Sequence, residues 1–321
     1  NIKILFFNKF RVIGMFFPLL SYLIKHKPEI IFSAEDHLNL ITTLACLVTF
    51  SKAKISTSSR VTPIDTYKNS NIFFSKGWFL KKLFPLVHRR ANVMTCVSKD
   101  MIKQYKKIFG KTKQVYAYNV IKTDEAKIKM KEKVNHLWFK SKKYQLIIAS
   151  GTLAKWKGFD DLIKAANILS KKEISFRLII LGGGPDKKKL NDLIKLYNLQ
   201  NKIKILKPVI NTLKYFYNSD IFVLSSRVEG MPNVMIEAMM CRCTIVANDC
   251  YTGPKEILGT NKYGYLSRVN DPKDLSKNII KALKKKIPYA KTKKILEQFS
   301  TERVIKRHFS LLKIDQKYWL I

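Results

Sequence analysis

The 321-residue sequence predicts an α/β protein made of two doubly wound, Rossmann-like domains that face a cleft. Two observations support this fold class. Short apolar runs alternate with longer amphipathic stretches in two series, and a lysine-rich segment without clear periodicity separates the series. We expect the domain boundaries as follows: a first domain over 1–122, a linker over 123–143, a second domain over 144–300, and a C-terminal helix over 301–321 that packs back toward the first domain.

The first series reads as strand and helix in turn. The expected elements are strands over 2–7, 29–34, 53–59, 91–98 and 113–119, and helices over 14–25, 38–50 and 99–108. This alternation is typical of parallel strands joined by crossover helices. The length also favours two domains, because a single core usually stops growing at roughly 250 to 300 residues.

The second series repeats the rhythm. The expected elements are strands over 144–151, 175–185, 202–209, 220–226 and 243–249, and helices over 159–169, 186–197, 213–218, 232–240, 255–258, 274–286 and 300–312. Open parallel sheets bind ligands beyond the carboxyl ends of their strands. Functional residues are therefore expected directly after strands.

The composition is that of a globular protein with a strongly basic surface. It is 46% hydrophobic and 26% charged, and 61 Lys and Arg face 23 Asp and Glu, a formal net charge of +38. Such a surface attracts anions, so nucleic acid, anionic lipid and phosphorylated substrates all qualify as partners. A lysine bias that merely solvates helix faces remains an alternative for most of these residues.

The cysteines and histidines predict neither disulfides nor a metal site. Five scattered cysteines are an odd number, which argues against a secreted disulfide framework and favours a reducing compartment. Neither residue type shows the ligand spacing of a zinc site. No apolar run reaches the 18 or more residues that a membrane span needs.

A glycine-rich turn follows the strand expected over 175–185. Gly182, Gly183 and Gly184 let the backbone approach a ligand, and the start of the next helix favours a phosphate. Pro185 and Asp186 interrupt the G-x-G-x-x-G spacing, which disfavours a dinucleotide dehydrogenase. A tight strand-to-helix turn without a ligand remains the alternative.

The stretch "SGTLAKWKGFDDLIKA" also follows a strand. Lys157 and Gly158 stand immediately before its helix, where a cation can reach a bound diphosphate. Solvated surface charges are the alternative for Lys155 and Lys157.

Two acids lie eight positions apart in "SSRVEGMPNVMIEAMM". Glu229 is expected in a loop and Glu237 inside the helix that Pro232 opens. The free amides of Asn233 and Val234 at that helix start form an anion site, and a carboxylate beside it can accept hydrogen bonds from sugar hydroxyls. The pattern suggests a bound sugar nucleotide, with Glu229 as a helix cap and an exposed Glu237 as the alternative.

Together these stretches resemble the family 4 glycosyltransferases, which are retaining, nucleotide-sugar-dependent enzymes with the GT-B fold. The resemblance covers nearly the whole chain. It rests on "SGTLAKWKGFDDLIKA", "LIILGGGPDKKKL", "SDIFVLSSRVEGMPNVMIEAMMCRCTIVANDCYTGPKEIL" and "FSTERVIKRHFSLL", the third of which holds the family's E-x7-E pattern.

The resemblance implies a role for each matching position. Glu229 would contact the donor sugar and support the reacting centre, so it is the expected catalytic residue. The expected donor-binding residues are Gly151, Lys157, Gly182, Gly184, Pro185, Gly230, Met231, Pro232, Asn233, Val234 and Glu237. Lys157 and the helix amides would hold the diphosphate and Glu237 the ribose, and no metal or other cofactor is expected.

Three departures from the family pattern stand out. Thr152 replaces an arginine expected to bind phosphate, for which Arg227 or Lys155 would substitute. Arg242 replaces a glycine at a position where a left-handed conformation is common. The sequence also resembles the family only from its third strand onward, so we expect an incomplete first domain that binds donor poorly and transfers little.

The resemblance implies a transferase that moves a hexose or N-acetylhexosamine from a UDP-sugar to a lipid-linked or surface polysaccharide acceptor. We expect it in the cytoplasm, peripheral on the anionic inner face of the membrane, with the basic, aromatic segment Phe73–Arg90 as a candidate contact; core packing of those aromatics is the alternative. The other possibilities are a basic nucleic-acid-binding protein, although no such module is legible, and a relative that binds glycans without catalysis.

Overall fold

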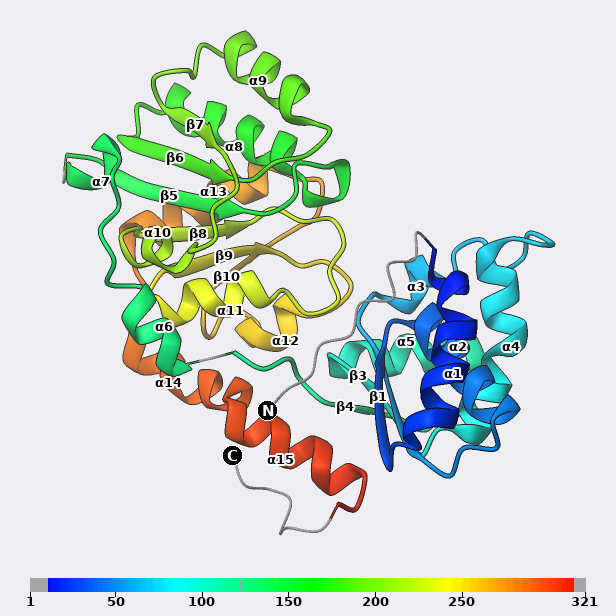
Figure 1. Ribbon diagram of the computed structural model, residues 1–321. Helices are drawn as coiled ribbons and strands as arrows, with labels where there is room; N and C mark the ends of the chain where they lie inside the picture. The colour runs from blue at the N-terminus through cyan, green and yellow to red at the C-terminus, as the bar shows by residue number, and fades with distance from the viewer. Residues whose placement is uncertain (1–10, 122, 142, 315–321) are drawn as a thin grey trace. The chain divides into compact units, whose positions relative to one another are not determined.

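The computed structural model describes residues 11–121, 123–141 and 143–314 (Figure 1), and the strand expected over 2–7 lies outside them. The chain divides into two compact units. Unit 1 comprises residues 1–118 and 305–321, and unit 2 comprises residues 119–304. Each unit has its own parallel sheet, as the sequence predicts.

Unit 1 contains a sheet of four described strands in the order β1-β2-β3-β4, all parallel. The strands are β1 (Ile30–Ala34), β2 (Lys54–Ser59), β3 (Val93–Cys96) and β4 (Gln114–Tyr116). The register pairs Ile31 with Ile55 and Thr57 with Met94. Because the strands follow chain order from one edge of the sheet to the other, each crossover connection moves one strand further in the same direction across the sheet.

The helices of unit 1 connect these strands. They are the 3-10 turn η1 (Val12–Met15), α1 (Phe16–His26), α2 (Asp36–Val48), α3 (Pro63–Thr66), α4 (Lys76–Arg90) and α5 (Lys99–Phe109). Leu23, Ala45, Cys46 and Ile55 form a buried cluster that joins α1 and α2 to the sheet. Ser98 caps α5 by accepting a hydrogen bond from the Met101 amide, and Gly110 ends it with a positive φ.

Unit 2 contains a sheet of six parallel strands in the order β10-β9-β8-β5-β6-β7. The strands are β5 (Gln145–Ser150), β6 (Phe176–Leu181), β7 (Ile203–Leu206), β8 (Ile221–Leu224), β9 (Thr244–Asn248) and β10 (Tyr265–Ser267). The chain runs outward from β5 through β6 to β7, then returns to the other side of β5 and runs outward again. The strand order therefore reverses between β5 and β8.

Unit 2 has helices on both faces of its sheet (Figure 1). They are α6 (Thr123–Lys129), α7 (Leu137–Lys140), η2 (Lys155–Lys157), α8 (Phe159–Lys171), α9 (Lys187–Leu196), α10 (Leu213–Tyr217), α11 (Asn233–Met240), α12 (Pro254–Leu258), α13 (Pro272–Lys284), α14 (Tyr289–Leu296) and η3 (Glu297–Phe299). The last helix, α15 (Thr301–Leu311), begins in unit 2, and its residues from Ile305 group with unit 1.

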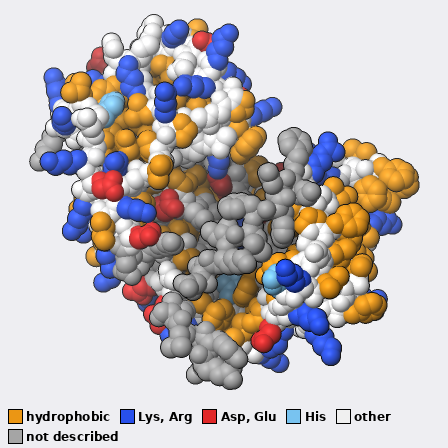
Figure 2. All heavy atoms as spheres, in the orientation of Figure 1, with side chains coloured by type: hydrophobic (Ala, Val, Ile, Leu, Met, Phe, Trp, Pro, Cys, Tyr) orange, Lys and Arg blue, Asp and Glu red, His pale blue; other side chains and the backbone are white. Residues whose placement is uncertain are grey.

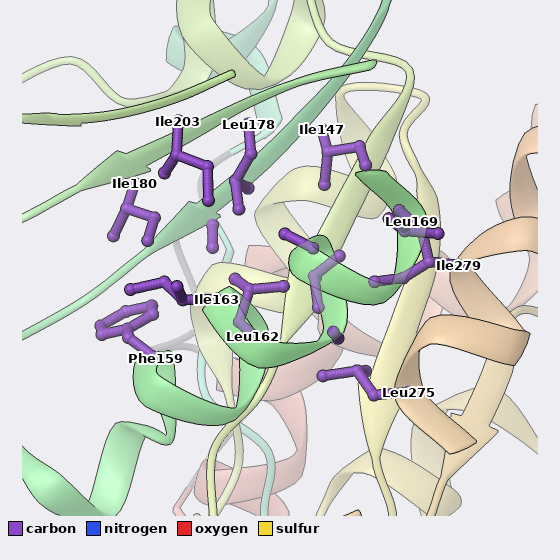
Figure 3. Close-up of a cluster of buried hydrophobic side chains, with 14 of the residues drawn as sticks. Ile147, Phe159, Leu162, Ile163, Leu169, Leu178, Ile180, Ile203, Leu275 and Ile279 are labelled. Carbon is purple, nitrogen blue, oxygen red and sulfur yellow. The ribbon is translucent and has the colours of Figure 1, made fainter. Parts of the chain in front are cut away.

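A buried apolar core lies between α8, α13 and one face of the second sheet. Figure 3 shows Phe159, Leu162 and Ile163 of α8 pointing toward Leu178 and Ile180 of β6. These α8 residues recur at helical spacing, and each is at most 4% exposed. The apolar face that the sequence indicates is thus the face that fixes α8, and with it the loop that precedes α8.

The structure adds elements that the sequence analysis did not predict. They are α3, α4, α6, α7, α14 and β10, together with the 3-10 turns η2 and η3. The expected linker over 123–143 contains α6 and α7, and both belong to unit 2. Arg242 has φ 70°, which confirms the left-handed conformation expected at this position. Among the described residues, no helix combines the length and the apolar character needed to cross a bilayer.

Candidate functional site

The candidate site lies where the strand order of unit 2 reverses. β5 pairs with β6 on one side and with β8 on the other. The loop after β5 carries Lys157 and the loop after β8 carries Glu229. All six strands are parallel, so both loops lie at the carboxyl edge of the sheet, where doubly wound proteins bind their ligands.

Lys157 and Glu229 form an ion pair across this position. Lys157 Nζ lies 2.5 Å from Glu229 Oε1, and the same oxygen accepts a hydrogen bond of 2.7 Å from Ser226 Oγ. Only 20% of the lysine side chain and 12% of the glutamate side chain is exposed. The structure thus brings together two predicted site residues that are 72 positions apart in the chain.

The loops that carry this pair are packed tightly on each other. Gly158 has φ 62°, and a Cβ there would lie 2.1 Å from the Ser225 carbonyl oxygen, so a side chain cannot be accommodated. Ser225 Oγ donates to the Lys157 carbonyl at 2.9 Å, and the Arg227 amide donates to the Trp156 carbonyl at 2.7 Å. These contacts fix Lys157 relative to the strand that delivers Glu229.

Arg227 holds the same loops together, and the expectation that it replaces the missing phosphate-binding arginine stays a prediction. Its guanidinium makes two bonds of 3.0 Å to the Asp160 carboxylate and one of 2.6 Å to Asp161. Its Nε donates to Asn270 at 2.6 Å. Burial would raise the pKa of Asp160, but the hydrogen bonds and charge of Arg227 outweigh it and hold that pKa below its usual value.

Two residues of the 249–253 loop lie close to Glu229. Thr252 is fully buried, and its hydroxyl donates to the Glu229 carbonyl. Cys250 is buried, and burial, with a smaller contribution from the charge of Glu229, raises the pKa of its thiol to about 12. This thiol therefore stays protonated at neutral pH and is a poor nucleophile.

Helix α11 begins without a side-chain cap. Its N-cap residue is Pro232, and no side chain accepts a hydrogen bond there, so Glu229 is not the cap that the simpler interpretation required. The first amides of a helix have no partner within it, which leaves those of Asn233 and Val234 for an anion. The Asn233 side chain accepts a hydrogen bond from Asn119 Nδ2 at 2.9 Å. Gly230 and Met231 lead into this start, and the Met231 side chain is buried.

Glu237 is not an exposed helix residue. Burial raises the pKa of its carboxyl, and the side chain lines a pocket of about 270 Å³. The other lining residues come from residues 120–129, from residues 210–213 and from the end of α11. They are Val120, Ile121, Glu125, Ala126, Lys129, Ile210, Asn211, Thr212, Leu213 and Met240. The second acid of the E-x7-E pattern thus faces a pocket of unit 2.

A second pocket, of about 230 Å³, lies at the carboxyl ends of β5, β6 and β7. Its lining residues are Ser150, Gly151, Thr152, Leu181, Gly182, Gly183, Pro208, Val209 and Thr212. Thr212 lines both pockets, so they adjoin. A Cβ on Gly182 would lie 2.0 Å from the Gly151 carbonyl oxygen, so this glycine lets the two loops meet. Gly184 and Pro185 follow in the chain and are exposed.

Sequence reasoning missed three residues of this site. Ser226 and Thr252 bind Glu229, and Thr212 joins the two pockets. Ser226 had a usable signal, because it directly follows a strand. Thr212 lies in a loop without a motif, and only the fold places it here. Among the residues that the structure describes, no group of three or more His, Cys, Asp or Glu gathers as a metal site would require, and independence from metal stays a prediction.

A family model and curated relatives both identify this chain as similar to glycosyltransferases. The family model for glycosyl transferases of group 1 matches residues 130–299, more than half of the chain. An uncharacterised glycosyltransferase of Methanocaldococcus jannaschii is 31% identical over 274 residues, which are 80% of this chain and 66% of that protein.

A relative from Campylobacter jejuni is N-acetylgalactosamine-N,N'-diacetylbacillosaminyl-diphospho-undecaprenol 4-alpha-N-acetylgalactosaminyltransferase. It is 28% identical over 223 residues, covering 69% of this chain and 58% of its own length. The chain thus spans about two thirds or less of these curated relatives.

The Anabaena protein HepE, solved in complex with UDP, superposes with a TM-score of 0.75 at 17% identity, covering 92% of this chain and 82% of HepE. At that identity the likeness shows the fold alone. The α/β class with parallel sheets and the likeness to GT-B glycosyltransferases, both predicted from the sequence, are confirmed.

Proposed function

Because the chain belongs to the glycosyl transferases of group 1, we propose that it transfers a hexose or N-acetylhexosamine from a UDP-sugar to a lipid-linked or polysaccharide acceptor, with retention of configuration. The name of the Campylobacter relative describes transfer of N-acetylgalactosamine to a diphospho-undecaprenol acceptor. HepE was solved with UDP. The Campylobacter name supports the transferred sugar and the acceptor class, and the HepE complex supports UDP as the donor nucleotide.

The observation that carries the proposal is the Lys157–Glu229 pair at the point where the strand order reverses. A donor diphosphate brings negative charge to this edge, and Lys157 can exchange its bond to Glu229 for bonds to phosphate oxygens. Glu229, still held by Ser226, then becomes free to accept hydrogen bonds from the donor sugar. The pair thus serves as the resting form of a donor site.

Neighbouring features of unit 2 provide binding sites for the other parts of the donor. The uncapped start of α11 favours the departing diphosphate, because its amides and dipole stabilise developing negative charge. The pocket that contains Gly151, Gly182 and Gly183 suits the nucleoside, and Glu237 in the adjoining pocket suits the ribose hydroxyls. We assign donor binding to unit 2 and acceptor binding to unit 1.

We further propose that transfer needs no metal ion. Lys157 and the α11 amides provide the positive charge that a divalent cation supplies in other transferases. Unit 1 would work at the cytoplasmic face of the membrane, where a lipid-linked acceptor meets anionic headgroups. Activity that persists in EDTA would support the first statement, and loss of activity restored by Mg²⁺ or Mn²⁺ would contradict it.

Ligand-induced stabilisation tests the donor. A ligand that binds only the folded state raises the melting temperature, so a panel of UDP-, GDP- and ADP-sugars should single out UDP-sugars. The matched variant is Lys157→Met, which should lose that shift, while Lys171→Met, which changes an exposed lysine at the end of α8 in the same unit, should keep it. A shift with GDP-sugars alone would overturn the UDP assignment.

Product analysis tests the reaction itself. Release of UDP that depends on acceptor, with an α-configured product from an α-configured donor by NMR, is the expected result. A protein that binds glycans without catalysis would retain acceptor and release no UDP. A nucleic-acid-binding protein would instead shift RNA or DNA in a salt-sensitive way, and Glu229→Gln would leave that shift unchanged.

A further inference from the structure

Unit 1 carries a cluster of exposed aromatic side chains on the loop before α4 and on the first turn of that helix. We call residues 69–79 the aromatic loop. The exposed fractions are 60% for Ile72, 66% for Phe73, 69% for Phe74 and 42% for Phe79. Figure 1 shows this loop projecting at the upper right, and Figure 2 shows hydrophobic side chains gathered over the same part of the molecule. Contiguous apolar patches of this kind mark interaction sites.

The aromatic rings contact one another. Phe73 lies 4.4 Å from Phe74 and 4.8 Å from Trp78, measured between ring centroids, and Phe79 lies 5.0 Å from Trp78. The alternative of core packing for these rings is therefore wrong for Phe73 and Phe74, which pack on each other at the surface. Together the rings present one apolar tip.

Several contacts hold the tip in place. Ser75 caps α4 by accepting a hydrogen bond from the Trp78 amide at 3.1 Å, and its hydroxyl donates to the Asn69 carbonyl at 2.5 Å. A Cβ on Gly77 would lie 3.1 Å from the Ser70 amide nitrogen, so the loop lies directly on the helix. Before the loop, buried Tyr67 donates to Asp36 at 3.1 Å. The exposed rings thus stand on a fixed base.

The backbone at the tip is strained. Phe74 has φ 60°, a conformation that bulky side chains rarely adopt. Both the strain and the exposure of Phe74 disfavour this arrangement in an isolated protein, and such features concentrate at functional positions. A partner that buries the rings would supply the missing favourable interaction.

The charges around the tip indicate which partner. The sequence has no acidic residue between Asp65 and Asp100. Lys68 lies directly before the aromatic loop, the loop and α4 carry Lys76, Lys81 and Lys82, and Arg89 and Arg90 end the helix. Lys68, Lys76 and Lys82 are exposed. Lys82 Nζ lies 6.0 Å from the Trp78 ring. Aromatic side chains beside lysines suit the boundary between headgroups and acyl chains of an anionic bilayer.

We propose that the aromatic loop enters the interfacial layer of an anionic membrane, with Phe73 and Phe74 among the acyl chains and the lysines of α4 at the headgroups. The biological setting rests on the function proposed above. The lipid contact itself is measured without donor or acceptor, so its failure and the failure of the transferase assignment are distinguishable.

Vesicle sedimentation of the full chain tests the apolar part. The double variant Phe73→Ser/Phe74→Ser should lower partitioning onto phosphatidylglycerol-rich vesicles at least tenfold. The control is Phe50→Ser, because Phe50 is 91% exposed and belongs to the same unit. Phe50 also has a positive φ of 50°, but it lies in the turn that ends α2, where a left-handed conformation is common. Equal loss in both variants, or none in either, overturns the proposal. Circular dichroism and melting temperature verify that each variant is folded.

The charge part has its own variants. Lys81→Gln/Lys82→Gln should weaken binding to phosphatidylglycerol vesicles severalfold and reduce its dependence on salt, whereas Lys171→Gln/Lys172→Gln, an exposed pair in unit 2, should not. Binding of equal strength to pure phosphatidylcholine would overturn the anionic assignment. Sedimentation that instead reveals a dimer abolished by Phe73→Ser/Phe74→Ser would assign the tip to a second copy of the chain and overturn the proposal.

Discussion

Lys157 Nζ lies 2.5 Å from Glu229 Oε1, and both side chains are largely excluded from solvent. Such a pair is stable only while both partners are present, because removing one leaves a desolvated charge. In the absence of donor each residue therefore satisfies the other. If the proposed donor binds here, its phosphate and sugar must replace this bond with contacts of comparable strength.

A double-mutant cycle tests this relationship. Lys157→Met and Glu229→Gln should each lower the free energy of unfolding, the lysine change by about 2 to 4 kcal/mol because it strands a carboxylate. The double variant should lose less than the sum of the two. Chemical denaturation of the four proteins measures the coupling. Strict additivity would show that the two side chains do not interact.

Glu229→Gln also separates folding from chemistry. If the carboxylate supports the reacting centre, kcat should fall roughly 100-fold or more, as when one preorganised group of an active site is removed. Donor-induced stabilisation should largely remain, since Lys157 is then released from its partner. Unchanged kcat would remove Glu229 from the reaction.

We expect Glu237 to lower the folding stability at neutral pH while it contributes to donor binding. Its pKa is raised by burial, so the free carboxylate disfavours folding once pH rises above the unfolded-state value of about 4.3. Glu237→Gln should therefore raise the melting temperature at pH 7 and have little effect near pH 4. The same variant should weaken UDP-sugar binding. A lower melting temperature at pH 7 would contradict the assignment of an unpaired, desolvated acid.

Arg227→Met should destabilise unit 2 by about 2 to 3 kcal/mol, because Asp160 and Asp161 lose the guanidinium that binds both of them and only Lys164, 3.5 Å from Asp161, remains as a cation. The pKa of Asp160 is depressed, so its share of this stabilisation is present above the usual carboxyl pKa and disappears as pH falls below it. Urea unfolding of both proteins at pH 7 and pH 3 should show the difference shrinking in acid. A gap that stays constant with pH would mean that packing, not charge, is lost.

Arg242 allows the cost of a left-handed residue to be measured. Its guanidinium lies over the rings of Tyr289, at 5.4 Å, and Tyr217, at 6.0 Å. Arg242→Ala loses these contacts and keeps the strain, while Arg242→Gly loses the same contacts and relieves the strain. The glycine variant should be more stable than the alanine variant by about 1 kcal/mol. Equal melting temperatures would indicate that the backbone relaxes.

The sequence predicts most of unit 2 because its periodicity is strong. The face of α8 repeats at helical spacing, and β8 is an uninterrupted apolar run, so both could be recognised without coordinates. Helix α14 and strand β10 escaped prediction. β10 is only three residues long, and α14 is lysine-rich with a single buried residue, Thr292, so neither has an apolar pattern of its own.

The candidate site shows the same limit. Lys157 and Glu229 could be predicted because each follows a strand and belongs to a long motif. The partners of Arg227 could not, since Asp160 and Asp161 resemble ordinary acids in the first turn of a helix. Contacts between loops depend on which strands are neighbours, and the return of the chain from β7 to β8 is not encoded in local periodicity.

The absence of room for a side chain at Gly158 has a consequence for how this edge of unit 2 can move. Wedged against the Ser225 carbonyl, the segment bearing Lys157 cannot swing away without carrying the neighbouring segment that bears Glu229. The two segments therefore move together. A ligand that displaces Lys157 would also displace Glu229, so substitutions that loosen either segment should weaken ligand binding and catalysis together.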